Sequence, residues 1–200
     1  MTGTATPDVD AGTGMPSPDQ DVVALLMAQH GEIRNLFDEV EQSEGDQRRD
    51  AFRGLVRMLA VHETAEEEVV HPYARRSVEG GAQIVDERLE EERKAKELLA
   101  RLDGMDPADE RFMPLLQELR TAVTEHARAE ERYEFAQLRR IHDQGALATM
   151  AQAVKAAEAT APTHPHPGVE SGAENVALGP IAAIADRARD AIRKATGKGR

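Results

Sequence analysis

The 200-residue sequence contains no cysteine and no tryptophan, and it has only two tyrosines and four phenylalanines. Without cysteine there can be no disulfide, thiolate zinc site, iron–sulfur cluster or cysteine nucleophile, so a bound metal would need nitrogen and oxygen ligands. No apolar run approaches the roughly 18 residues of a membrane span, and the N-terminus lacks the basic and apolar regions of a signal peptide. We therefore predict a cytoplasmic protein without a membrane span.

The charge balance argues against a nucleic-acid partner. The chain has 25 Lys and Arg against 37 Asp and Glu, for a net charge of -12. A nucleic-acid surface would need clustered cations and aromatic side chains for stacking. The middle of the chain is instead rich in Glu, Ala, Leu and Arg, a composition that favours helix.

Four segments have an apolar residue at every third or fourth position, which is typical of helices that face other helices. They cover residues 19–44, 46–71, 82–102 and 109–140. Because the connections between them are short, neighbouring helices should run antiparallel. We predict an all-α fold, an up-down-up-down four-helix bundle over residues 20–142.

The segments outside the bundle have different compositions. Residues 1–19 are poor in large apolar side chains and are predicted to be a disordered tail. Residues 143–161 are Ala-rich and predict a helical extension, followed by a Pro/Gly linker over 162–178. Residues 179–200 predict an amphipathic helix with a basic end. We expect this helix to dock on the acidic bundle, with a protein partner or a membrane surface as alternatives.

The bundle contains an internal repeat that places ionisable residues in its core. Shifting the second helix by 64 residues superimposes His62 and Glu66 on His126 and Glu130, with apolar residues matching on both sides. Shifting the first helix by 62 residues superimposes His30 on Glu92.

Ionisable residues at one level of a core need partners that compensate their charge, because burying a lone carboxylate costs several kcal/mol. A histidine and a glutamate four residues apart project from one helix face, so the imidazole can bind one metal while the carboxylate bridges two. The alternative is a set of buried His–Glu ion pairs. The pattern favours a dinuclear metal site, with open positions for a small ligand. Its predicted ligands are His30, His62, Glu66, Glu92, His126 and Glu130.

At these residues the sequence resembles the hemerythrin-like, or HHE cation-binding, family. The matching motifs are LLMAQHGEI around His30, HETAE at 62–66 and HARAE at 126–130, and the resemblance spans residues 20–142. It implies two iron ions with oxo or hydroxo and carboxylate bridges. In that reading Glu66 and Glu130 bridge, and the terminal ligands are His30, His62, Glu92 and His126.

Glu92 departs from the family, which usually has histidine at this position. The extra negative charge favours the ferric state and makes the centre more similar to oxygen-activating diiron carboxylate proteins than to a reversible oxygen carrier. Glu91 is an alternative ligand on the same helix, and Glu63 is a further terminal oxygen. We expect both of these side chains to be solvated.

For the remaining candidate residues we predict structural roles and no part in the metal site. His71 lies about 140° around an α-helix from Glu66 and directly before Pro72, so it is predicted to be a helix-end residue and not a ligand. Tyr133 is predicted to pack in the core, with a hydrogen bond toward the dimetal pocket as the alternative, and His142 is predicted to face solvent. The run Glu66–Glu68 is expected to face partly outward. His164 and His166 in the linker could hold only an adventitious ion.

The resemblance implies a non-haem diiron protein that binds or reacts with O2, NO or peroxide, in sensing, detoxification or iron handling. The expected ligand is a small diatomic or peroxide molecule. One alternative is a diiron enzyme with catalase-like or ferroxidase activity. The other is a metal-free helical interaction module, which bound metal would exclude.

Overall fold

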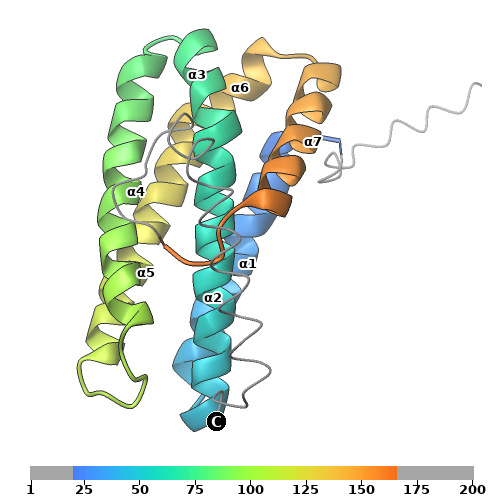
Figure 1. Cartoon of the computed structure of the whole chain (residues 1–200). Coiled ribbons are helices and arrows are strands. Elements are labelled where there is room, and N and C mark those ends of the chain that lie inside the picture. The colour runs from blue at the N-terminus through green and yellow to red at the C-terminus, as the bar shows by residue number, and fades with distance from the viewer. Residues whose placement is uncertain (1–19, 166–200) are drawn as a thin grey trace, which may run out of the picture.

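The computed structural model describes residues 20–165 and shows a bundle of long antiparallel helices (Figure 1). Its main helices are α1 (Val22–Gln42), α2 (Gly45–Ala65), α4 (Gly81–Asp103) and α5 (Phe112–Ala129). The predicted all-α four-helix bundle is confirmed. Among the described residues, no helix is long and apolar enough to cross a membrane.

Two of the four long helices, α2 and α5, continue through a π-helical turn. α2 continues through η1 (Glu66–Val70) into α3 (His71–Ser77). α5 continues in the same way through η2 (Glu130–Phe135) into α6 (Ala136–Ile141). A π-turn adds one residue to a turn of helix and thereby rotates everything that follows it, and such turns are frequent at functional sites.

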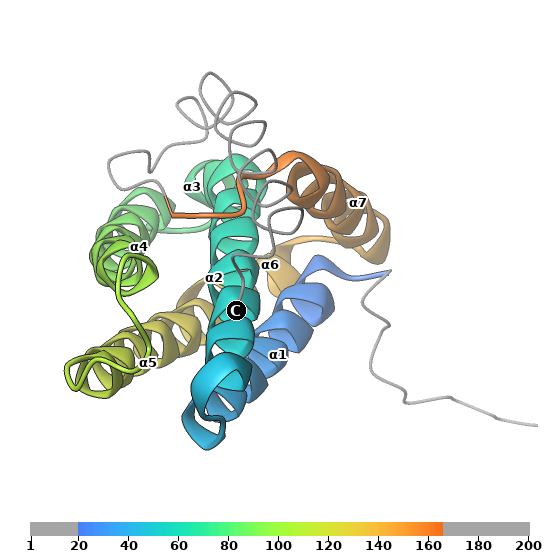
Figure 2. The same cartoon turned by 60° about the horizontal axis from the view of Figure 1, so that its bottom comes forward.

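A further helix, α7 (Gln144–Thr160), packs against α1, α2 and η1 (Figure 2). Asp143 caps its N-terminus, and the Asp143 side chain accepts a hydrogen bond from the backbone N–H of Ala146. This helix lies within the extension predicted from composition. The predicted N-terminal tail and the predicted amphipathic C-terminal helix lie outside the described residues.

The sharp turn between α3 and α4 depends on two glycines. Gly80 has a φ of +71°, in the left-handed region that favours glycine. A Cβ on Gly81 would lie 2.3 Å from the backbone oxygen of Ala74, so only glycine permits this close approach. The turn brings α4 alongside α3 and sets the height of Glu92 in the bundle.

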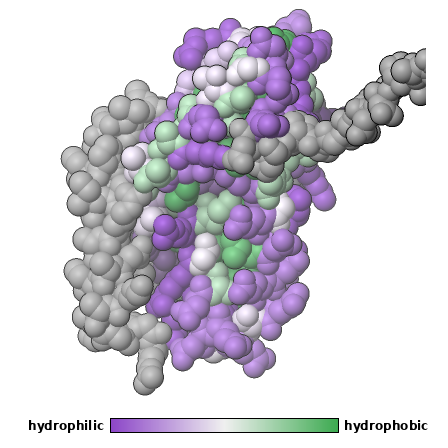
Figure 3. Space-filling model, turned by 90° about the vertical axis from the view of Figure 1, so that its right-hand side faces the viewer, coloured by the Kyte–Doolittle hydropathy of each residue, from purple (hydrophilic) through white to green (hydrophobic). Residues whose placement is uncertain are grey.

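The hydrophobic core is divided into two clusters. One lies around the start of α1, α3, η2 and α7, and the other around the end of α1 with α2, α4 and α5. The surface in Figure 3 is mostly hydrophilic, with smaller hydrophobic areas between the polar side chains. The ionisable residues singled out above lie between the two clusters. Phe135 of the first cluster stacks on the His30 ring with the centroids 5.7 Å apart, and Phe37 and Leu59 of the second line a pocket together with His30 and His62.

Candidate metal centre

The six predicted ligands come together in the middle of the bundle. Their ligand atoms form two groups, and within each group every atom lies within 4.8 Å of the others. Glu66 and Glu130 belong to both groups, while the other members belong to one. The first group is His30, His62, Glu66 and Glu130, and the second is Glu66, Glu92, His126 and Glu130.

The three histidines of these groups all turn the same ring nitrogen inward. The Nε2 atoms of His30 and His126 each lie 3.3 Å from an oxygen of Glu130. His62 Nε2 lies 3.3 Å from Glu66 Oε2. A neutral imidazole that donates from Nδ1 has its lone pair on Nε2, which is the atom that would bind a metal here.

An acceptor behind each ring holds its Nδ1. His30 Nδ1 donates to Glu131 Oε1 over 2.9 Å, and His126 Nδ1 donates to Glu91 Oε2 over 3.1 Å. His62 Nδ1 donates to Gln29 Oε1 over 2.7 Å. Metal-binding histidines are almost always oriented by such a partner on the other nitrogen.

α7 supports this arrangement from outside the four-helix bundle. The amide nitrogen of Gln29 donates to Glu158 Oε1 on α7 over 2.5 Å. This bond orients the Gln29 amide so that its oxygen faces His62. The fifth helix therefore takes part in fixing the tautomer of a candidate ligand.

The centre contains buried polar atoms with no hydrogen-bond partner. They include both carboxylate oxygens of Glu66, both of Glu130, one of Glu92, and Nε2 of His30 and of His126. Leaving such groups buried and unpaired costs free energy. All of these side chains carry donor atoms of the kind that bind transition metals. The residues present therefore fit a pair of cations.

The buried charges are also unbalanced. The buried carboxylic side chains around the centre are Glu63, Glu66, Glu67, Glu92, Glu130 and Glu134, whereas the buried lysine and arginine residues among those described are Lys96 and Arg88. Lys96 pairs with Glu67, and Arg88 pairs with Glu91 at 2.7 Å. Bound cations would neutralise the remaining carboxylates. Without them burial favours protonation of Glu66, whereas the nearby His71 and His126 hold the pKa of Glu92 and of Glu130 below its ordinary value against the effect of burial.

The pKa values of the metal-free centre reflect this environment. Burial and the nearby His30 lower the pKa of His62 to about 3, so its imidazole is neutral at pH 7. Burial raises the pKa of Glu63 to about 8 and, together with Glu92, that of Glu67 to about 9. Burial and repulsion by Glu130 raise the pKa of Glu66 well above its ordinary value.

The structure corrects the predictions made for three other glutamates. Glu63 and Glu67 were expected to be solvated or to face outward, yet both are buried. Burial of Glu67 is compensated by Lys96 on α4, a contact that the α2 sequence alone does not reveal. Glu91 is half-buried behind His126 and is in neither group, so the structure brings Glu92 and not Glu91 to the candidate ligands.

The π-turns account for two further errors. Five residues along an α-helix is 140° around the axis, but the backbone N–H of His71 bonds to the oxygen of Glu66, the i to i+5 bond of a π-turn. His71 therefore lies on the same face as Glu66 and is buried, which makes its prediction as a helix-end residue wrong. In η2, Tyr133 is 50% exposed and Glu134 is buried, so Tyr133 does not pack in the core.

Two histidines outside the centre also differ from expectation. His142 is half-buried and makes an edge-on contact with Tyr73, their ring centroids 5.0 Å apart. His164 follows α7 and is buried, although a flexible linker was predicted there. His166 lies outside the described residues.

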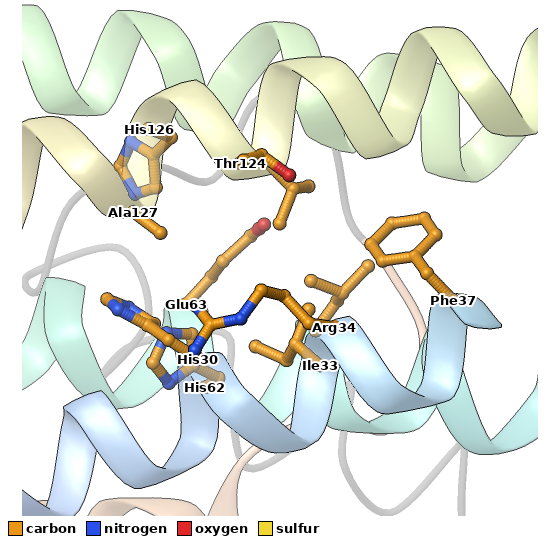
Figure 4. A pocket seen from close by; sticks show the side chains of 11 residues that line it. His30, Ile33, Arg34, Phe37, His62, Glu63, Thr124, His126 and Ala127 are labelled. Atoms are coloured by element: carbon orange, nitrogen blue, oxygen red, sulfur yellow. The ribbon is translucent and has the colours of Figure 1, made fainter.

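A pocket between α1, α2 and α5 reaches the centre (Figure 4). About 20 Å³ of it is open to a molecule the size of water, which is room for roughly one water molecule. His30, His62 and His126 line its inner part, and Glu63 extends across it toward Thr124. Its apolar walls are formed by Ile33, Phe37, Leu59 and Val123.

Two known proteins are similar to this chain in sequence. An uncharacterized hemerythrin-like protein of Schizosaccharomyces pombe is 30% identical over 139 residues, which are 68% of each chain. A DNA nickase of a Nostoc strain is 30% identical over 128 residues, but these are 63% of this chain and only 36% of the nickase. The chain thus spans about a third of the length of that relative.

A solved structure has the same fold. It is the Hemerythrin HHE cation binding domain-containing protein of Mycobacterium kansasii, with a TM-score of 0.61 and 16% identity over 70% of this chain and 85% of that one. The sequence profile of the Hemerythrin HHE cation binding domain matches residues 21–138, which include every member of both candidate ligand groups. The chain therefore belongs to the hemerythrin HHE cation-binding domain family.

Proposed function

We propose that this protein holds two iron ions in the centre of its bundle and uses them to bind or react with O2, NO or peroxide in the cytoplasm. The observation that carries the proposal is the pair of four-residue groups joined by Glu66 and Glu130. Such a geometry allows each of these carboxylates to bridge two ions. A nitrogen and oxygen ligand set without thiolate suits iron, and the family resemblance favours it over other metals of similar preference.

The protein's own residues supply the metal ligands and the access to the centre. When bound, the iron pair would supply electrons and open coordination positions. His30 and His62 would hold one ion, and Glu92 and His126 the other. The pocket admits a small molecule to the three imidazoles. In the metal-free fold the pKa of Glu63 is about 8, so its carboxyl group holds a proton at pH 7 there.

The test is the metal content of the purified chain. We expect about two irons per chain in the wild type, and loss of most of that iron when His62 and His126 are both changed to alanine. His142→Ala is the matched control, because His142 belongs to neither group. Less than one metal per chain, or iron that survives the double substitution, would contradict the proposal.

Glu92 favours a second candidate function, a diiron enzyme with catalase-like or ferroxidase activity. A carboxylate ligand stabilises the ferric state more than an imidazole does. Turnover of peroxide or ferrous ion would distinguish this enzyme from a sensor. We do not propose a nicking activity for this chain, although a relative from Nostoc is a DNA nickase, since a net charge of -12 disfavours contact with DNA.

Replacing Glu92 should change the electronic properties of the centre without emptying it. In Glu92→His we expect an unchanged iron count and a higher reduction potential, because a neutral nitrogen replaces an anionic oxygen. Glu91→Ala should leave the potential close to that of the wild type and weaken metal binding only through loss of the bond to His126. Redox titration followed by the visible spectrum measures both. Identical potentials in the wild type and Glu92→His would exclude Glu92 as a ligand.

A further inference from the structure

His71 is buried beside the candidate centre but differs from the three histidines of the two ligand groups. Each of those rings has one nitrogen held from behind and Nε2 facing the carboxylates. In His71, by contrast, each ring nitrogen contacts a different carboxylate. Nε2 lies 2.5 Å from Glu92 Oε1, and Nδ1 lies 3.1 Å from Glu134 Oε1. The ring therefore has no nitrogen lone pair facing the centre.

The same contacts leave Glu92 with two different oxygens. Oε1 is held by His71 and also lies 3.7 Å from His126 Nε2, whereas Oε2 is buried and has no hydrogen-bond partner. A carboxylate that is held at one oxygen presents its remaining lone pairs in a defined direction. Partners of this kind around a ligand commonly set its orientation and its affinity for metal.

Glu134 completes a chain of contacts from α4 through α3 to η2. Its Oε1 accepts from His71, and its Oε2 is buried without a partner. These contacts need both π-turns. η1 turns His71 inward, and η2 places Glu134 and not Tyr133 at the buried position. The contacts thus join the ends of both π-turns to a candidate ligand on α4.

We propose that His71, held by Glu134, is a positioning residue that fixes Glu92 to bind the second metal ion. The inference rests on the proposed dinuclear centre, but it concerns only the ion held by Glu92 and His126. The ion at His30 and His62 should not depend on His71. A third cation held by His71, Glu130 and Glu134, whose ligand atoms also lie within 4.8 Å of one another, is the competing interpretation.

The experiment compares His71→Leu and His71→Gln in the full chain. His71→Leu fills the space without a donor, and His71→Gln retains an amide that can donate to Glu92. Anaerobic titration with Fe²⁺ gives the number and affinity of bound ions, and titration with Co²⁺ gives a visible spectrum sensitive to the ligands of each ion. We expect His71→Leu to bind one ion normally and the second about 10- to 100-fold more weakly.

His71→Gln should recover much of the second affinity, and the Co²⁺ bands of only one ion should change. Glu134→Gln should produce a smaller loss in the same ion, and His142→Leu should produce none. If His71→Leu does not fold, His71→Gln and Glu134→Gln still test the inference, because a purely structural role would weaken both ions equally.

The outcomes separate this inference from the proposed function. A wild type that binds no metal contradicts the proposed function itself. A wild type that binds two ions, with unchanged affinities and spectra in the His71 variants, overturns only the inference about His71. Three ions per wild-type chain would make His71 a ligand and would also overturn it. Equal weakening of both ions in His71→Gln and Glu134→Gln would have the same consequence.

Discussion

Glu130→Ala is expected to empty both metal positions, a larger loss of metal than substitution of a residue that belongs to only one group should cause. Glu130 belongs to both four-residue groups, and its two oxygens face His30 Nε2 and His126 Nε2 at 3.3 Å each. We expect the iron content to fall from about two per chain to near zero. His30→Ala removes a ligand of only one group and should leave about one ion. Metal analysis after desalting measures both.

Glu130→Gln is the matched control for this result. The glutamine has nearly the same shape but lacks the charge, so it shows whether a bridging anion or the filled space retains the metal. We expect Glu130→Gln to lose nearly as much iron as Glu130→Ala. Two irons per chain in either variant, in a protein with a native circular dichroism spectrum, would rule out Glu130 as a bridge.

The second large effect is on stability. Removing the metal should lower the melting temperature and make it fall further as the pH rises from 7 to 8.5. In the metal-free fold the pKa of Glu63 is about 8 and that of Glu67 about 9, both raised by burial from an ordinary value of 4.5. Between the ordinary and the raised values the native chain holds protons that the unfolded chain has released. Stability therefore decreases with rising pH over this interval.

The size of the decrease follows from linkage. Each such group contributes about 1.4 kcal/mol per pH unit while it stays protonated in the native chain, so Glu63 and Glu67 together should cost the metal-free protein roughly 3 kcal/mol between pH 7 and 8.5. For a chain of this size that is about 6 to 12 °C in melting temperature. The lowered pKa of His62, about 3, destabilises the fold only below pH 6.5 and does not interfere in this range.

Differential scanning calorimetry of the metal-loaded and metal-free forms at both pH values measures these effects. Glu63→Gln should reduce the pH dependence of the metal-free form, because it removes one of the groups that release a proton in this range. Equal melting temperatures with and without metal would mean that the buried carboxylates are already compensated within the fold. No dinuclear site would then be needed to explain their burial.

The two predictions have a common physical origin. The bundle buries more carboxylates than cations between two apolar clusters, and it can satisfy them with metal ions or with protons. At neutral pH bound cations avoid the uptake of protons by groups such as Glu63 and Glu66. Metal binding and protonation should therefore compensate the same buried carboxylates. Loss of metal should lower the stability most at high pH, where these groups are least protonated.

The sequence alone determined the helical bundle and the residues that would meet in its centre. Apolar residues repeating every three or four positions require helices that face one another, and short connections require antiparallel neighbours. The repeat then places His62 and Glu66 at the same height as His126 and Glu130, since equivalent residues of a repeated hairpin occupy equivalent levels. Family membership follows from the same motifs.

Only the tertiary structure decided which residues surround that centre. A π-turn adds one residue to a helix without changing the local composition, so a period of 3.6 residues places His71 and Tyr133 incorrectly. Burial of Glu67 depends on Lys96, which lies 29 residues away on α4. The orientation of His62 depends on Gln29 and, through it, on Glu158 of α7. These contacts join residues far apart in the chain, and packing selects them by electrostatic compensation that no single helix can display.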